Sequence, residues 1–179
     1  MKDVKLAKNF SLSEFAKKEV TSYQIQLLTV LAKQLQKVRD SLQSYRSGKK
    51  AVSISIASGV RYDGDYERLK KQGLNPAKNS DHFCGLQVGA VPTLGAADIH
   101  VNNCQLSLKD VALLIKSMCE SGDVRFGQII YEENPKTGGK WIHLSNDPEY
   151  IFNKEVIKVT RKKFLMSLDN GKTFKVLKA

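Results

Sequence analysis

Two of the three histidines in this 179-residue chain lie in segments whose chemistry suits a metal ion. His82 stands in Ser-Asp-His at 80–82, Asp98 in Ala-Ala-Asp-Ile at 96–99, and His143 in Trp-Ile-His at 141–143. Together they offer two imidazole nitrogens and one carboxylate, a donor set that favours zinc. Three protein ligands leave the fourth tetrahedral position open to water or substrate. An open position is typical of hydrolytic zinc sites, whereas structural sites close all four.

Each of these residues also has an ordinary interpretation. A single histidine is more often a hydrogen-bonded core or surface residue than a ligand. Cys84 lies two residues after His82 and could compete as a ligand, but we interpret it as a small buried residue beside the site. The other cysteines are Cys104 and Cys119. An odd number without paired spacing argues against a disulfide framework and suits a reducing compartment.

Four short motifs follow one another along the chain: Ser-Gly-x-Arg at 58–61, Ser-x-His-x-x-Gly at 80–85, Ala-Ala-Asp-Ile at 96–99 and Trp-Ile-His-x-Ser at 141–145. Their order resembles the D-alanyl-D-alanine carboxypeptidase family of zinc peptidases, which shares its core with lysostaphin-type endopeptidases and the hedgehog signalling domain. The segment 8–15 is similar to the N-terminal helix entry of the subgroup common in bacteria and their phages. The resemblance covers roughly residues 5–146, most of one domain of the usual size.

The resemblance implies that His82, Asp98 and His143 hold zinc. Many relatives place an acidic residue three positions before the last histidine as general base, but this chain has Lys140 there, and an ammonium cannot act as a carboxylate would. The nearest replacements are the two glutamates after the strand that precedes it. We expect Glu132 to be the base, because it is similar to a Tyr-Glu of the phage-type subgroup.

The resemblance also implies that Arg61 contacts the carbonyl or terminal carboxylate of the substrate, and a planar, permanently charged guanidinium suits that role. Its alternative is a structural salt bridge with Asp63 or Asp65. Ser80 is expected to orient the loop or the substrate. We expect Trp141 to form part of the wall of the substrate groove. The alternative interpretation is that it is a core residue.

An insertion is a second departure from the family. In the family, the first histidine and the aspartate lie close together in one short motif. In this chain, residues 86–95 separate Gly85 from Ala96. A looped-out insertion can preserve the ligand geometry, because longer surface loops cost little free energy. We expect it to reshape the groove.

Periodicity predicts the elements that position these residues. A Ser-x-x-Glu capping box starts a helix at Ser11, with Phe10 and Phe15 as a hydrophobic staple, and an apolar stripe predicts a long helix over 21–44. Alternation predicts strands over 52–56 and 95–101, the second with Asp98 and His100 on one face. The remaining predicted elements are a short polar helix at 64–72, an irregular segment at 74–94, a helix from Ser107 to about 120, strands at 126–131 and 140–144 joined by 132–139, and a final hairpin of 164–168 with 173–177.

This order predicts an α+β fold with N-terminal helices packed on a small antiparallel sheet that carries the zinc ligands, the plan of the hedgehog-like peptidases. We divide the chain into a zinc peptidase-like domain over 1–149 and a C-terminal β-hairpin extension over 150–179. The extension lies outside the resemblance, and it either extends the sheet or forms a docking element.

Composition bounds the partners. The net charge of +11 favours polyanions, whether nucleic acid or an acidic wall polymer. Nucleic acid is not expected, because no reading motif is present and aromatic residues are not interleaved with the basic runs. No apolar run has membrane-spanning length and the N-terminus lacks a secretory signal, so we expect no membrane partner and cytoplasmic synthesis without a signal peptide.

The leading hypothesis is an enzyme, a zinc metallopeptidase that hydrolyses a peptide bond next to a D-amino acid in peptidoglycan, as carboxypeptidase or endopeptidase. It would act on the cell wall after lysis or as part of a phage particle, with peptidoglycan peptides and virion components as partners. The alternative is a non-catalytic zinc-binding module of the same fold, which binds wall fragments or serves as a phage structural part. Lys140 and the insertion favour this non-catalytic alternative.

Overall fold

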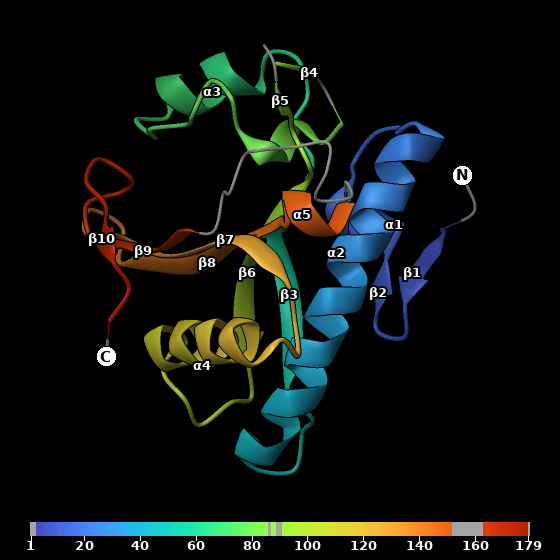
Figure 1. Cartoon of the computed structure of the whole chain (residues 1–179). Coiled ribbons are helices and arrows are strands. Elements are labelled where there is room, and N and C mark those ends of the chain that lie inside the picture. Colours follow the sequence, from blue (N-terminus) through green and yellow to red (C-terminus); the bar gives the residue numbers. More distant parts are fainter. Residues whose placement is uncertain (1–2, 86, 89–90, 152–162, 179) are drawn as a thin grey trace.

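The structure is a computed structural model that describes residues 3–85, 87–88, 91–151 and 163–178 (Figure 1). It is an α+β fold built on one six-stranded sheet of order β10-β9-β7-β8-β6-β3, with two additional two-stranded sheets. The strands of the large sheet are β3 (Ser53–Ser58), β6 (Ala96–Asn102), β7 (Phe126–Asn134), β8 (Gly139–Asn146), β9 (Lys163–Ser167) and β10 (Lys175–Val176).

The N-terminal segment confirms the predicted capping box. Glu14 Oε2 accepts a hydrogen bond from the Ser11 backbone N–H (2.7 Å), and the rings of Phe10 and Phe15 lie 6.1 Å apart in the core. The helix that starts here, α1 (Leu12–Phe15), is a single turn. It follows a small antiparallel sheet of β1 (Lys5–Ala7) and β2 (Phe10–Ser11), which the sequence did not predict.

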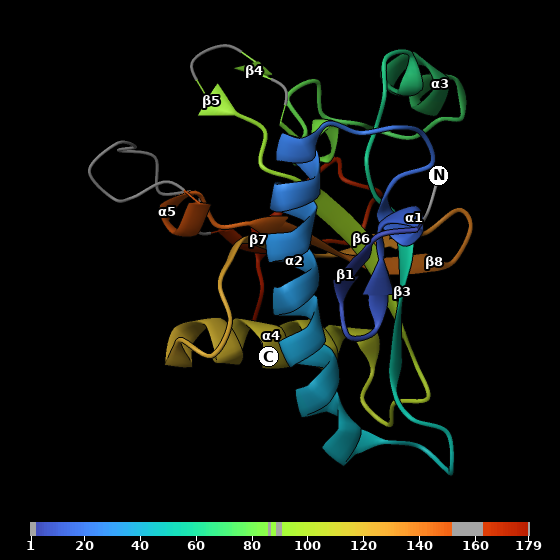
Figure 2. The same cartoon turned by 90° about the vertical axis from the view of Figure 1, so that its right-hand side faces the viewer.

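The long helix α2 (Ser22–Ser41) has Thr21 as its N-cap and continues into a 3₁₀ turn, η1 (Leu42–Tyr45). Its predicted stripe is buried from Leu28 to Leu42, and Ile25 packs partly buried against the same core. Figure 2 shows α2 lying lengthwise against the sheet, with β1 and β2 beside it. It contacts β1, β3 and β8.

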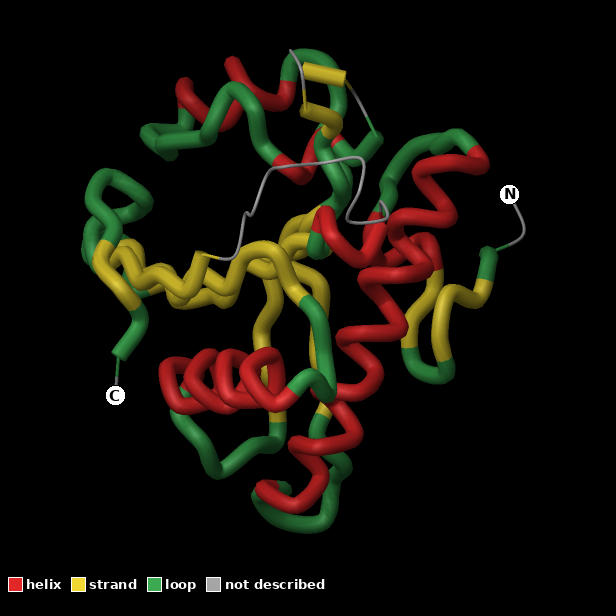
Figure 3. Tube along the Cα trace, viewed as in Figure 1, coloured by secondary structure: helices red, strands yellow, loops and turns green. Residues whose placement is uncertain are grey.

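The two faces of the large sheet have different neighbours. Helix α4 (Leu108–Ser121), capped by Ser107 as predicted, packs on β7 and β8 and joins their apolar side chains Ile129, Ile142 and Leu144 in the core. On the opposite side stand α3 (Asp65–Lys71) and the 3₁₀ turn η2 (Asp81–Phe83), at the top of Figures 1 and 3. Because strand residues alternate between faces, residues next to these core positions face away from α4.

Two predictions about the sheet are wrong. The sheet is mixed rather than antiparallel, because β9 pairs in parallel with β7. The predicted final hairpin is formed by β9 and β10, and it extends the sheet. A hairpin pattern in the sequence does not indicate whether the strand beside the hairpin runs parallel or antiparallel to it. In addition, β7 continues to Asn134, so Glu132 lies inside a strand opposite Trp141 and not in a connection.

The structure adds two short elements. The connection after β8 includes α5 (Pro148–Ile151). Within the predicted irregular segment, β4 (Gln87–Val88) pairs with β5 (Val91–Pro92). Among the described residues, every helix is too short or too polar to cross a bilayer.

Gly59 marks the closest approach between the N-terminal helix and the sheet. The Val60 N–H donates to the Phe15 carbonyl at 2.7 Å, and a Cβ on Gly59 would lie 2.1 Å from that same oxygen. No side-chain rotation can relieve a contact with backbone. Only glycine therefore fits between α1 and the end of β3.

We predict that Gly59→Ala destabilises the protein by more than about 2 kcal/mol, because α1 must separate from β3 to admit the methyl group. The measurement is urea unfolding followed by circular dichroism. Gly139→Ala is the matched control, because its Cβ would meet side chains and no backbone, namely the hydroxyl oxygen of Thr137 at 3.2 Å and Cζ3 of Trp141 at 3.9 Å. Equal unfolding free energies for the two variants would contradict the prediction.

Candidate metal centre

Three side chains from different elements converge on one point. Asp98 on β6 and His143 on β8 are directly opposite each other in the sheet, and His82 comes from η2. Asp98 Oδ1 lies 3.2 Å from His82 Nε2 and 3.0 Å from His143 Nδ1, and the two histidine nitrogens are 3.2 Å apart. All three residues are buried. This group could bind a metal ion.

The spacing of the three atoms fits a tetrahedral ion. Zinc bonds to nitrogen and oxygen at about 2.0–2.1 Å, which places neighbouring ligands about 3.3 Å apart. The observed separations of 3.0–3.2 Å are close to that value. Two imidazoles with one carboxylate also form a donor set that zinc accepts readily.

A backbone carbonyl orients the first histidine. His82 Nδ1 lies 2.7 Å from the Gly59 carbonyl oxygen, and donation of its proton there leaves the Nε2 lone pair facing Asp98 and His143. The Arg61 backbone N–H in turn donates to the His82 carbonyl at 2.8 Å. The Ser-Gly-x-Arg motif thus holds a candidate ligand in place, as outer-shell partners do in metal sites.

Electrostatics keep the carboxylate ionised. Burial alone would raise the pKa of Asp98, but the charges and hydrogen bonds of His82 and His143 outweigh burial and hold this pKa far below its ordinary value. Burial lowers the pKa of His82, whereas at His143 the hydrogen bond and charge of Asp98 outweigh burial and raise the pKa. An ionised carboxylate and a neutral imidazole are the forms that a metal ion requires.

Arg61 and Ser80 lie together beside the ligands. Arg61 Nη1 donates to Ser80 Oγ at 3.3 Å, and Nη2 is 3.9 Å from Asp98 Oδ2. Asp65, the alternative partner considered for Arg61, pairs instead with Arg68 at 3.0 Å. Arg61 Nε is buried and has no hydrogen-bond partner among the described residues. The guanidinium therefore has one donor that the described residues do not use.

The ligands open into a cavity of about 650 Å³. Its floor is the sheet face opposite α4, and its roof is α3 with the loop that follows. The lining includes Arg61, Ser80 and Trp141, so the three residues predicted to bind substrate share one space with His82, Asp98 and His143.

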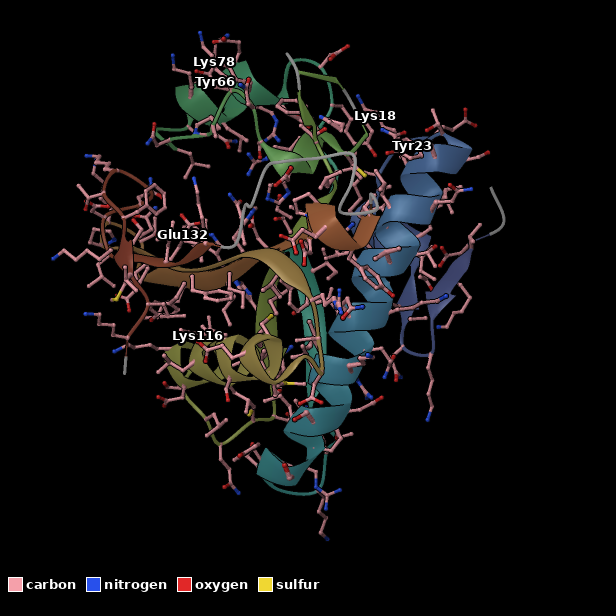
Figure 4. The ribbon with its side chains drawn as sticks, in the orientation of Figure 1. Lys18, Tyr23, Tyr66, Lys78, Lys116 and Glu132 are labelled. Carbon is pink, nitrogen blue, oxygen red and sulfur yellow. The ribbon has the colours of Figure 1, made fainter. Side chains whose placement is uncertain are left out.

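Glu132 also lines the cavity, from β7. Burial raises the pKa of its carboxyl, and the strongest opposing influence is the charge of His143. Figure 4 shows Glu132 at the end of the sheet that adjoins the C-terminal hairpin. The structure therefore brings the predicted base into the same cavity as the ligands.

Lys140 lies on the other side of the sheet. Strand alternation separates it from Trp141 and His143, and its Nζ is 3.2 Å from Glu133 Oε1. Glu133 also accepts a hydrogen bond from the Tyr131 hydroxyl. Lys140 therefore does not face the cavity.

The insertion leaves the ligand geometry intact. Gly85 N–H donates to the Thr93 carbonyl at 2.7 Å, and Gly95 N–H to the Asp81 carbonyl at 3.1 Å, which closes the loop at its base. Residues 92–95 do not line the cavity, so the expected reshaping of the groove finds no support in them.

Cys84 is fully buried beside this closure, and burial raises the pKa of its thiol to about 12. It lies outside the cluster of candidate ligands, which supports its interpretation as a packing residue. None of the three cysteines, all of which lie in the described part of the chain, forms a disulfide.

Sequence reasoning missed part of the cavity wall. The C-terminal hairpin contributes Leu165, Asn170, Gly171 and Phe174, and the loop after α3 contributes Leu74. The Asp-Asn-Gly turn at 169–171 was visible as a turn, but no pattern indicated which surface it meets.

Comparisons of the chain with models of protein families, with curated proteins and with solved structures found no match. The chemistry of the site therefore rests on its own geometry.

We predict that the protein binds one zinc ion and that His143→Ala weakens binding by more than about 100-fold, beyond the usual effect of losing an outer-shell partner. The measurement is calorimetric titration of chelator-treated protein together with elemental analysis. His100→Ala is the control, because His100 lines the same cavity two residues from Asp98 but lies outside the cluster. Equal zinc affinity in both variants would refute the assignment.

Proposed function

We propose that this protein is a zinc-dependent peptidoglycan peptidase with a hedgehog-like, D-alanyl-D-alanine peptidase-like fold, which hydrolyses a peptide bond next to a D-amino acid. One observation carries the proposal. A buried cluster of two imidazoles and a carboxylate opens into a cavity that also contains a half-buried carboxylate, Glu132, and a partly unpartnered guanidinium, Arg61. These groups are the components that amide hydrolysis requires.

Zinc would be held by His82, Asp98 and His143. When bound there, it would supply a Lewis acid that polarises a peptide carbonyl and makes water more acidic. The buried site fixes the ligands before the ion arrives, because two of them are opposite each other on neighbouring strands.

Glu132 is the residue we assign to proton transfer. It would accept a proton from the attacking water and deliver it to the leaving amine. A general base works best when its pKa lies near the working pH, and burial shifts the pKa of Glu132 upward from its ordinary value.

Arg61 is the residue we assign to substrate binding. Arg61 lines the cavity, and a guanidinium can bind a carboxylate or a carbonyl oxygen with two parallel donors. The Ser80 hydroxyl accepts from Arg61 Nη1 and from the His82 backbone N–H, so it holds the arginine and the ligand loop in one arrangement.

The substrate class rests on the order of the motifs and on charge. The net charge of +11 favours an anionic surface such as a bacterial wall, and action after lysis or within a phage particle would bring the protein to it. The non-catalytic alternative depended on Lys140 and on the insertion. Lys140 faces away from the cavity and the insertion leaves the ligands together, so neither argues against hydrolysis.

We predict that Glu132→Gln lowers the release of peptides from purified peptidoglycan by about 100- to 10,000-fold, because the amide cannot take up the proton, while zinc content stays unchanged. The measurement is mass spectrometry of the released peptides beside elemental analysis of the protein.

Glu133→Gln is the matched control, since the neighbouring glutamate pairs with Lys140 outside the cavity. It should retain near-normal turnover. Zinc binding without peptide release in the unaltered protein would favour the non-catalytic module, and equal turnover in both variants would remove Glu132 from the mechanism.

A further inference from the structure

We propose that the C-terminal hairpin is a specificity element, in which Phe174 and Leu165 form an apolar subsite for a peptide side chain longer than that of alanine. The inference rests on the proposed function in one respect, that the ligand is a peptide. The hairpin lies outside the segment that resembles known peptidases, so it would distinguish this chain from them.

The first support is the register of the sheet. Asp98, His143, Ile130 and Leu165 form one continuous cross-strand row over β6, β8, β7 and β9. Neighbouring strands lie about 4.8 Å apart, so Leu165 stands about 10 Å from His143 along the cavity floor. That distance corresponds to about three residues of extended peptide.

The second support is the rigid construction of the turn between β9 and β10. Asp169 accepts hydrogen bonds from the Ser167 hydroxyl (2.9 Å) and from both the backbone (2.9 Å) and hydroxyl (2.6 Å) of Thr173. The turn is also attached at both sides of the cavity. Asn170 N–H donates to the Glu133 carbonyl of the floor, and Asn75 of the roof loop donates to the Gly171 carbonyl, each at 2.9 Å.

The third support is the position of Phe174 next to the proposed chemistry. A Cβ on Gly171 would lie 3.4 Å from Glu132 Oε2 and 3.8 Å from Phe174 Cζ, so the ring stands one glycine away from the carboxylate. The side chain lines the cavity although the residue is 48% exposed. An aromatic ring that remains half exposed in a cavity wall gains most from an apolar ligand that covers it.

The occupant is apolar because the surrounding wall is apolar. Leu74, Pro76 and Ala77 line the roof, and Ile130 and Leu165 line the floor. A longer aliphatic side chain would bury its methylene groups here, whereas the methyl group of alanine is too short to fill the space. Each buried methylene contributes about 0.8 kcal/mol, so three should favour the longer side chain by tenfold or more.

The test measures binding of two synthetic peptides, acetyl-alanyl-D-alanyl-D-alanine and acetyl-norleucyl-D-alanyl-D-alanine. Zinc-loaded Glu132→Gln protein is used so that the peptides stay intact, and calorimetry gives both dissociation constants. We expect the norleucine peptide to bind at least about tenfold more tightly. Adding Phe174→Ala should reduce this preference to less than about threefold, because the ring forms much of the subsite.

Val176→Ala is the matched control. Val176 is an exposed apolar residue of the same hairpin, at 58%, and it does not line the cavity, so its removal should leave the preference unchanged. A second readout is kcat/KM for the two peptides in the catalytically intact background, where Phe174→Ala should raise KM for the norleucine peptide more than it lowers kcat.

The possible outcomes separate the two proposals. Preferential binding that depends on Phe174, without any cleavage, would support the subsite and contradict the peptidase. Three results would overturn the subsite while cleavage still supports the peptidase. They are equal binding of the two peptides, a preference for the norleucine peptide that persists in Phe174→Ala, and a loss of that preference in Val176→Ala as large as in Phe174→Ala. Binding of neither peptide would also overturn the subsite.

Discussion

The meeting of Asp98 with His82 and His143 is the constraint on which the rest of the structure depends. A carboxylate buried away from water costs several kcal/mol unless it is paired and hydrogen-bonded. Here both imidazoles contact the same oxygen, at 3.2 and 3.0 Å. Loss of either partner would leave the charge under-compensated. The surrounding fold must therefore hold η2, β6 and β8 in fixed positions relative to one another.

The large sheet meets this requirement because one of its faces packs in the core and the other lines the cavity. Ile129, Ile142 and Leu144 face α4 and join the main core. Their neighbours in sequence, including Ile130 and His143, face the cavity. The rigidity of a packed core is thereby transmitted to the site through the strands themselves, since alternate residues of the same backbone serve both faces.

Segments distant in sequence complete the site by close backbone contacts. Gly59 allows α1 to touch the end of β3, and its carbonyl then fixes the ring of His82. The Gly85–Thr93 hydrogen bond closes the insertion, so His82 and Asp98 meet despite the sixteen positions between them. The turn at Gly171 joins roof and floor through Asn75 and the strand that carries Glu132. Each contact is between backbone groups or involves one, which is why small residues occupy these points.

Local patterns in the sequence determined much of the architecture. The capping box at Ser11, the apolar stripe of α2 and the alternation along β3 and β6 depend on spacings of two to four residues, and so on neighbours in the chain alone. The residue types and the order of the motifs indicated His82, Asp98 and His143 as one set. Only the tertiary structure decided which strands pair, that β9 runs parallel to β7, and that Glu132 faces the cavity while Lys140 faces away. The physical reason is that strand direction, and the surface a turn meets, depend on contacts between residues far apart in the sequence, which no short pattern records.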